Sequence, residues 1–235
     1  MTSEEIADAL VYRDYEQIVM RLTAEGITDE CGDDKKKELL NRSLGLAALR
    51  MGDLDSAHLA IEALLGDDSA PSSRDYCELA SLYWMQSKTD TATSTLQKAL
   101  KCHYGDAAGN LIPALLCYYF ALRLQDVELG NYAEETIRNK LRAGISKNWP
   151  GPIGCFLADK LDEGSVMERL EQLHPIRQPD ERCRFDFYRG VKALERQDSV
   201  EASCLFAQAV GHLGQKTWTA EFNLAKHELV VLAAS

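Results

Sequence analysis

One spacing recurs along this chain: a small residue is followed twelve positions later by an alanine. The pairs are Gly45 and Ala57, Ala80 and Ala92, Ala121 and Ala133, and Gly190 and Ala202. Self-similarity of this kind is the signature of a repeat architecture, in which helical hairpins stack on their neighbours. The sequence therefore predicts an all-α stack that acts by offering a surface, rather than a domain built around catalytic residues.

The residues around these pairs explain the spacing. Helix backbones approach closely only where a side chain is small, and larger apolar residues fill the space around such a crossing. The most complete segment has Tyr76, Leu79-Ala80 and Tyr83, followed by Ala92, Leu96 and Ala99. This pattern resembles the tetratricopeptide repeat, which pairs two antiparallel helices in about 34 residues. The resemblance implies a right-handed α-solenoid of about five repeats, with capping helices at both ends.

We expect one solenoid domain over 1–235, and the positions of the small residues set the bounds of its repeats. Helical periodicity predicts an N-terminal cap pair over 1–36. Repeats are expected over 37–71, 72–106, 107–147 and 180–214, and a capping helix over 217–235. Ser72 or Ser73 is available to cap the first helix of the second repeat.

The phase also predicts a degenerate repeat over 148–176. Short helices are expected around 153–161 and 165–173, opened by Trp149-Pro150-Gly151-Pro152, because proline is tolerated at a helix start. The stretch 149–161, with Phe187-Tyr188-x-Gly190, is similar to bacterial tetratricopeptide lipoproteins of the cell envelope. The first ten residues carry Glu4, Glu5 and Asp8 and show no signal for lipidation or secretion.

Charge and cysteine content restrict the compartment and the partner. A net charge of −11 argues against nucleic acid, whose phosphates need a basic face. No apolar run reaches the length that spans a bilayer. Seven cysteines without C-x-x-C spacing indicate reduced thiols, so we expect a cytoplasmic protein.

Chemical motifs do not support catalysis. The sequence has no P-loop, Rossmann fingerprint, G-x-S-x-G or H-E-x-x-H pattern. Cys102-His103 is the one adjacent pair of soft ligands, and neighbours at a helix end point in different directions. We therefore expect no enzyme, no cofactor and no metal site.

The groove of the stack is the predicted functional site. In the tetratricopeptide family the first helix of each pair lines the concave face. Counting from the small residues, this face would present Arg42, Leu46, Arg50, Arg74, Ser81, Trp84, Tyr118, Leu122, Arg184 and Phe187. Arginines and aromatic residues are typical of binding hot spots, and arginine grips a carboxylate with two hydrogen bonds. A partner peptide would place an acidic group near the arginines. For Leu46 and Leu122, a place in the core between helices is the favoured interpretation.

The C-terminal segment carries an apolar stripe of Trp218, Phe222, Ala225, Leu229 and Leu232. A helix that covers the core of the last repeat explains this stripe. Homodimerisation through the same helix is the alternative, since Val230, Val231 and Leu232 make its end apolar.

Three functions fit these features. The leading one is a bacterial cytoplasmic adaptor or scaffold that binds a protein or peptide in its groove. The first alternative is a small acidic immunity protein or secretion-type chaperone that neutralises a basic partner. The second alternative, from the lipoprotein-like half, is a regulator of an envelope hydrolase.

Overall fold

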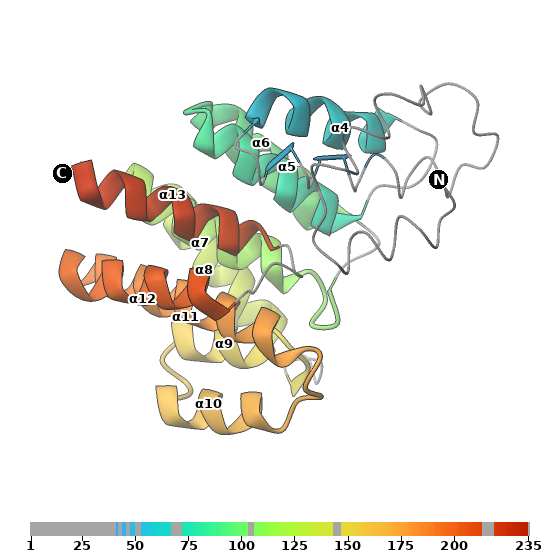
Figure 1. Ribbon diagram of the computed structural model, residues 1–235. Helices are drawn as coiled ribbons and strands as arrows, with labels where there is room; N and C mark the ends of the chain where they lie inside the picture. The colour runs from blue at the N-terminus through green and yellow to red at the C-terminus, as the bar shows by residue number, and fades with distance from the viewer. Residues whose placement is uncertain are drawn as a thin grey trace. The chain divides into compact units, whose positions relative to one another are not determined.

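The computed structural model describes residues 41, 44–45, 48–49, 53–66, 72–102, 106–142, 147–212 and 219–234. Within these ranges the protein is all-helical (Figure 1). The chain divides into two compact units, residues 1–71 and 72–235, and each is considered by itself. The predicted cap pair over 1–36 lies outside the described residues, as do Arg42, Leu46, Arg50 and Trp218. None of the helices in the described ranges is long and apolar enough to cross a membrane.

The described part of the first unit contains α4 (Leu54–Gly66) and, before it, helical backbone at residues 41, 44–45 and 48–49. Gly45 lies in helical backbone before it, and an added Cβ there would lie 3.0 Å from Cγ1 of Ile61. Ala57 is fully buried. Gly45 therefore stands at a close crossing, where a larger side chain would force the two helices apart.

The second unit is built from antiparallel helical hairpins. The hairpins are α5 (Ser73–Met85) with α6 (Thr89–Lys101), α7 (Leu111–Leu124) with α8 (Val127–Leu141), and α11 (Gln178–Glu195) with α12 (Ser199–His212). Two short helices, α9 (Gly151–Leu157) and α10 (Glu163–Glu171), occupy the predicted degenerate repeat. Ser72 caps α5 as expected, in a capping box with Asp75.

One turn recurs between paired helices. The N–H groups of Asp53, Lys88, Asp126 and Asp198 each donate to the carbonyl oxygen five residues earlier, at 2.8–3.0 Å. This bond is the Schellman closure of a helix, and it satisfies a carbonyl that the helix end leaves without a partner. Three of these four residues also cap the next helix, because an Asp side chain accepts from a backbone N–H three residues on.

The recurring turn gives a structural register for the repeat. Gly45, Ala80 and Gly190 lie eight residues before the donor of the turn, and Ala57, Ala92 and Ala202 lie four residues after it. In α7–α8 these two positions are Tyr118 and Gly130. Ala121 and Ala133 stand about one helical turn further along the chain, although both are buried.

An aromatic core runs through the second unit. Trp84 of α5 stacks on Phe120 of α7 with ring centroids 4.1 Å apart. Tyr119 and Phe187 meet edge to face at 5.1 Å, and Phe187 contacts Phe206 of α12 at 5.6 Å. Aromatic contacts of this geometry add to the free energy gained by burying the rings. Three hairpins therefore share one continuous core.

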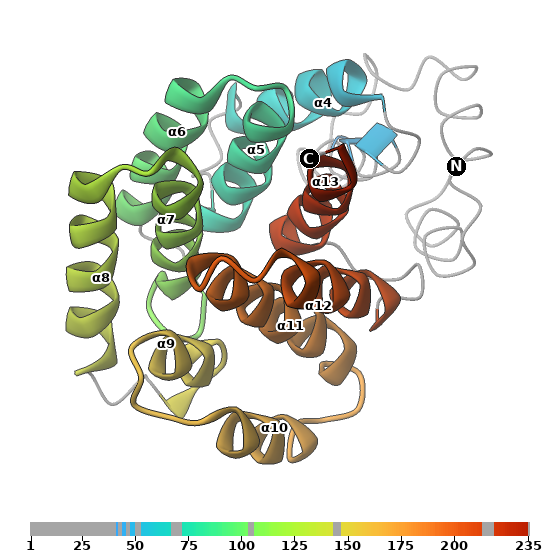
Figure 2. The same ribbon diagram turned by 90° about the vertical axis from the view of Figure 1, so that its left-hand side faces the viewer.

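The last helix, α13 (Ala220–Ala234), packs against α12 and also against α11 and α5 (Figure 2). Its buried positions include Glu221, Leu224, Ala225 and Glu228. Of the predicted stripe, Ala225 is fully buried, whereas Phe222, Leu229 and Leu232 are partly buried against the core. Besides contacting α12, α13 therefore covers part of α11, the first helix of the same pair, and part of α5, the first helix of another pair.

Buried ion pairs join α13 to the helices beneath it. Glu221 accepts from Nε of Arg184 at 3.0 Å, and Glu228 accepts from the hydroxyl of Tyr119 at 2.5 Å. Nε of Arg123 lies 3.0 Å from the same Glu228 oxygen. Because both glutamates are 1% exposed, their charges depend on these partners.

His227, beside Glu228, makes the stability of this docking depend on pH. Burial lowers the pKa of His227 below its ordinary value, against the opposing effect of Glu228. The unfolded chain therefore binds this proton more readily, and stability falls as pH drops through the ordinary histidine range. We expect a His227→Gln variant to show a flatter dependence of its unfolding free energy on pH between about 7.5 and 5.5. Urea titrations at several pH values measure this, and an unchanged slope would contradict it.

Candidate functional site: a cleft at the helix N-termini

The candidate site is a cleft of about 350 Å³ at one end of the second unit. The N-terminal ends of α5, α7, α11 and α13 line it, together with Trp149 and Pro150 at the start of α9. Alternate helices of an antiparallel stack begin at the same end, which is why these segments meet. We call it the arginine cleft, after Arg74, Arg177 and Arg184 in its walls.

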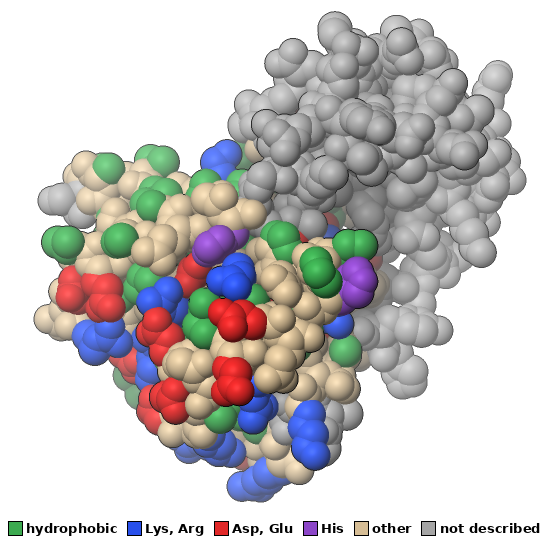
Figure 3. Space-filling model, turned by 60° about the horizontal axis from the view of Figure 1, so that its bottom comes forward, with side chains coloured by type: hydrophobic (Ala, Val, Ile, Leu, Met, Phe, Trp, Pro, Cys, Tyr) green, Lys and Arg blue, Asp and Glu red, His purple; other side chains and the backbone are tan. Residues whose placement is uncertain are grey.

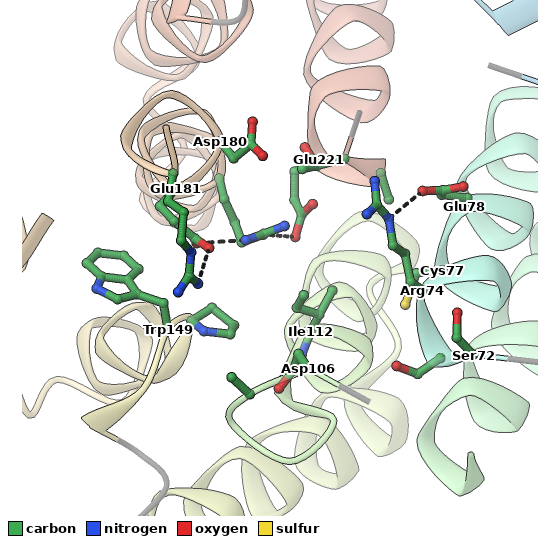
Figure 4. Close-up of a pocket in the computed structure, with 17 residues that line it drawn as sticks. Ser72, Arg74, Cys77, Glu78, Asp106, Ile112, Trp149, Asp180, Glu181 and Glu221 are labelled. Atoms are coloured by element: carbon green, nitrogen blue, oxygen red, sulfur yellow. Dashed lines mark hydrogen bonds and ion pairs between the residues drawn. The ribbon is translucent and has the colours of Figure 1, made fainter. Parts of the chain in front are cut away.

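One wall is built by α5. Arg74 donates from Nε to Glu78 at 2.9 Å, one turn further along the helix. The Arg74 side chain is 59% exposed, whereas that of Glu78 is 3% exposed. The carboxylate therefore lies beneath, and the guanidinium lies at the surface of the cleft. Figure 4 shows this pair on one side of the cleft and Glu181 with Trp149 on the other.

The opposite wall is built by the start of α11. Glu181 accepts from Nη1 of Arg184 at 2.7 Å and from Nη2 of Arg177 at 3.5 Å. Arg184 is nearly buried, and its other contact is Glu221 of α13. Burial by itself lowers the pKa of Arg184, but the two adjacent carboxylates outweigh it and raise the pKa above its ordinary value. Arg184 is therefore a fixed charge, whereas the Arg177 side chain is 52% exposed.

The floor of the cleft contains the segment before α7. Both oxygens of Asp106 are used by backbone: Oδ1 accepts from Ala108 N at 2.9 Å and Oδ2 from Ile112 N at 2.7 Å. Asp106 thus caps α7 from four residues before Asn110. Its charge compensates the partial positive charge of the helix end, which is roughly half a unit for each helix.

The most exposed arginines of the cleft, Arg74 and Arg177, carry positive charge at its surface, although acidic side chains outnumber arginines in its lining. Five acidic and three arginine side chains line it. The glutamates that pair with the arginines are buried, and Asp106 is engaged by N–H groups. The N-termini of α5, α11 and α13 add positive potential, whereas Asp106 offsets that of α7. The exposed charges of the cleft are therefore the guanidinium groups of Arg74 and Arg177, with the Asp180 carboxylate partly exposed beside them.

Among the described residues, Cys77 contributes the one thiol that lines the cleft. It is 2% exposed, and burial, with Glu221 and other acidic neighbours, raises its pKa well above its ordinary value. Cys117 and Cys183 are also buried, and Cys204 is exposed. Within the described ranges, no three His, Cys, Asp or Glu side chains are placed to hold a metal ion.

We expect alkylation of the native protein to follow this burial. Iodoacetamide should label Cys204 rapidly, whereas Cys77, Cys117 and Cys183 should react only after unfolding. Peptide mapping by mass spectrometry, with the urea-unfolded protein as the control, measures each thiol. Rapid labelling of native Cys77 would show that the cleft holds an accessible, reactive thiol.

The groove residues named from the sequence fall into two groups. Arg74 and Arg184 come together in the arginine cleft. Ser81, Trp84, Tyr118 and Phe187 are buried, at 0%, 7%, 9% and 0% exposure, and Leu122 is partly buried. These side chains lie in the hydrophobic core or pack against it, and Tyr118 also lines a cavity of about 230 Å³.

Several cleft residues were missing from the sequence-based prediction, chiefly Arg177, Trp149 and Glu221. They precede or open helices, whereas the prediction counted positions inside helices. A search of the residues at the start of every second predicted helix would have found them. A comparison with known families finds no matching family model, and a comparison with curated proteins finds no matching sequence. The site is therefore argued from its geometry.

Proposed function

We propose that this protein is a non-catalytic adaptor that binds an acidic segment of another protein or peptide in the arginine cleft. The observation that carries the proposal is the arrangement of Arg74 and Arg177. Both are more than half exposed, whereas the glutamates with which they pair are at most 7% exposed. A carboxylate of a partner can thus reach guanidinium N–H groups that the buried glutamates leave accessible.

The chemistry of the cleft supports binding rather than catalysis. The Cys77 thiol is buried and its pKa is raised well above its ordinary value, and Asp106 is held by backbone N–H groups. General acid–base catalysis needs groups poised to exchange protons. The arrangement instead offers fixed charges at a helical surface, which suits recognition.

We retain a tetratricopeptide-like solenoid and a cytoplasmic location as parts of the proposal. The small-residue spacing and the recurring turn support the former. The six cysteines in the described ranges are free thiols, which supports a reducing compartment. The alternative of an acidic protein that neutralises a basic partner gains no support on the face shown in Figure 3, where acidic and basic side chains are interspersed.

Binding of peptide pools tests the proposed function. Fluorescence anisotropy compares a labelled random decapeptide pool rich in Asp and Glu with a pool rich in Lys and Arg. We expect the acidic pool to bind, and Arg74→Gln to weaken it by about tenfold, since hydrogen bonds to charged groups contribute roughly 1.5–3 kcal/mol.

The matched control is Arg138→Gln. Arg138 is 60% exposed and pairs with Glu134 one helical turn away, as Arg74 pairs with Glu78. It lies outside the arginine cleft. Equal losses in both variants, or preferential binding of the basic pool, would overturn the proposal.

A further inference from the structure

A second cavity of about 510 Å³ adjoins the arginine cleft. Ala107, Trp149 and Arg177 line both cavities, so they form a shared wall. The second cavity lies between the segment before α9, the end of α10 and the start of α11. We call it the basic pocket.

The charged lining of the basic pocket has one sign. Lys147, Arg169 and Arg177 line it, and no Asp or Glu of the described residues does. This is unusual in a chain with 37 acidic and 26 basic residues. In the arginine cleft, by contrast, carboxylates outnumber the arginines.

Two of these cations are not neutralised by neighbours. Lys147 and Arg169 are exposed and form no ion pair within the part of the chain that the structure describes. Arg177 contacts Glu181 only at 3.5 Å. Since the three side chains come from three separate segments and face one cavity, their positive potentials add inside it.

We propose that the basic pocket binds a phosphate-class dianion. A doubly charged ligand gains about twice the Coulomb energy of a monovalent anion from the same three cations. Its several acceptor oxygens can be shared among Lys147, Arg169 and Arg177, with the amides of Asn148 and Gln172 also in the lining. Guanidinium groups bind phosphate oxygens in pairs, which chloride does not allow, and the second negative charge distinguishes this ligand from acetate.

The phosphate has two sources with the same chemistry. It is either a free phosphate compound or a phosphorylated side chain of a partner segment that continues from the arginine cleft. The second source rests on the proposed function, and the shared wall formed by Trp149 and Arg177 is what allows one segment to reach both cavities.

Calorimetric titration with inorganic phosphate tests the pocket without any partner. At pH 7.5 and low constant ionic strength, we expect one site that chloride and acetate do not fill. Arg169→Gln and Lys147→Gln should each lower the affinity for phosphate by at least about tenfold. Arg138→Gln and Arg74→Gln should leave this affinity unchanged. Thermal unfolding checks that each variant is folded. The absence of binding, or equal binding by all variants, overturns the proposal.

A peptide pool with a fixed phosphoserine, compared with its serine counterpart, distinguishes the two sources. Losses in both Arg169→Gln and Arg74→Gln assign the phosphate to a partner segment that spans both cavities. If phosphorylation does not raise the affinity of the peptide pool while inorganic phosphate binds, the ligand of the basic pocket is a free phosphate compound. If phosphate binds and the acidic pool does not, the phosphate site in the basic pocket is supported and the proposed adaptor function is wrong.

Discussion

An Arg184→Met variant should lose about 3–5 kcal/mol of unfolding free energy, because it leaves Glu221 charged and buried without its cation. Glu181 also loses its 2.7 Å partner and keeps only the longer contact to Arg177. Urea unfolding followed by circular dichroism measures the loss. The loss should be one of the largest for a single substitution in the second unit, since the pair joins α11 to α13.

A second substitution separates the ion pair from general damage. Arg184→Met/Glu221→Leu removes both charges, and we expect it to be more stable than Arg184→Met alone. Arg138→Met is the control, because its ion pair is exposed and its loss should cost less than about 0.5 kcal/mol. If Arg184→Met were as mild as this control, α13 would not be docked on α11.

A Gly190→Ala variant should be destabilised by about 1–3 kcal/mol, although alanine favours a helix over glycine by about 1 kcal/mol. A Cβ at Gly190 would lie 2.6 Å from the ring of Phe206. Phe206 is fully buried and packed against Phe187, so the ring has no space into which it could move. The clash should therefore outweigh the gain in helix propensity.

Gly130→Ala is the matched control for this substitution. Its Cβ would have Ala121 Cβ as its nearest neighbour at 3.8 Å, which is an ordinary contact. Only the propensity effect remains, so this variant should be stabilised by about 0.5–1 kcal/mol. Midpoints of urea unfolding compare the two. Stabilisation of both would mean that α11 and α12 are not in close contact at Gly190.

The helical hairpins could be predicted from local sequence because their signals are local. Ser72 caps α5 in the way its position indicates, and Pro152 lies in the first turn of α9. The aspartates that cap second helices, such as Asp126 and Asp198, carry an equally local signal. They place Gly130 rather than Ala133 at the turn-defined position of the third hairpin.

The docking of α13 could not be predicted in this way. Its buried face includes Glu221 and Glu228, which an apolar stripe does not reveal. Their partners are remote in sequence: Tyr119 lies 109 residues from Glu228. A buried charge is stable only with such partners, so this face becomes visible only when the fold brings them together. Arg74 and Arg184 could be named from sequence because they lie inside helices, whereas Arg177 stands at the N-cap of α11.

The most direct test is residue-resolved arginine modification with phenylglyoxal, read by mass spectrometry, with and without the acidic peptide pool. We expect rapid modification of Arg74, Arg177 and Arg138 and slow modification of Arg184, which α13 covers. The acidic pool should then protect Arg74 and Arg177 and leave Arg138 reactive. Modification of Arg184 as fast as that of Arg74, or protection of neither cleft arginine, would contradict the account.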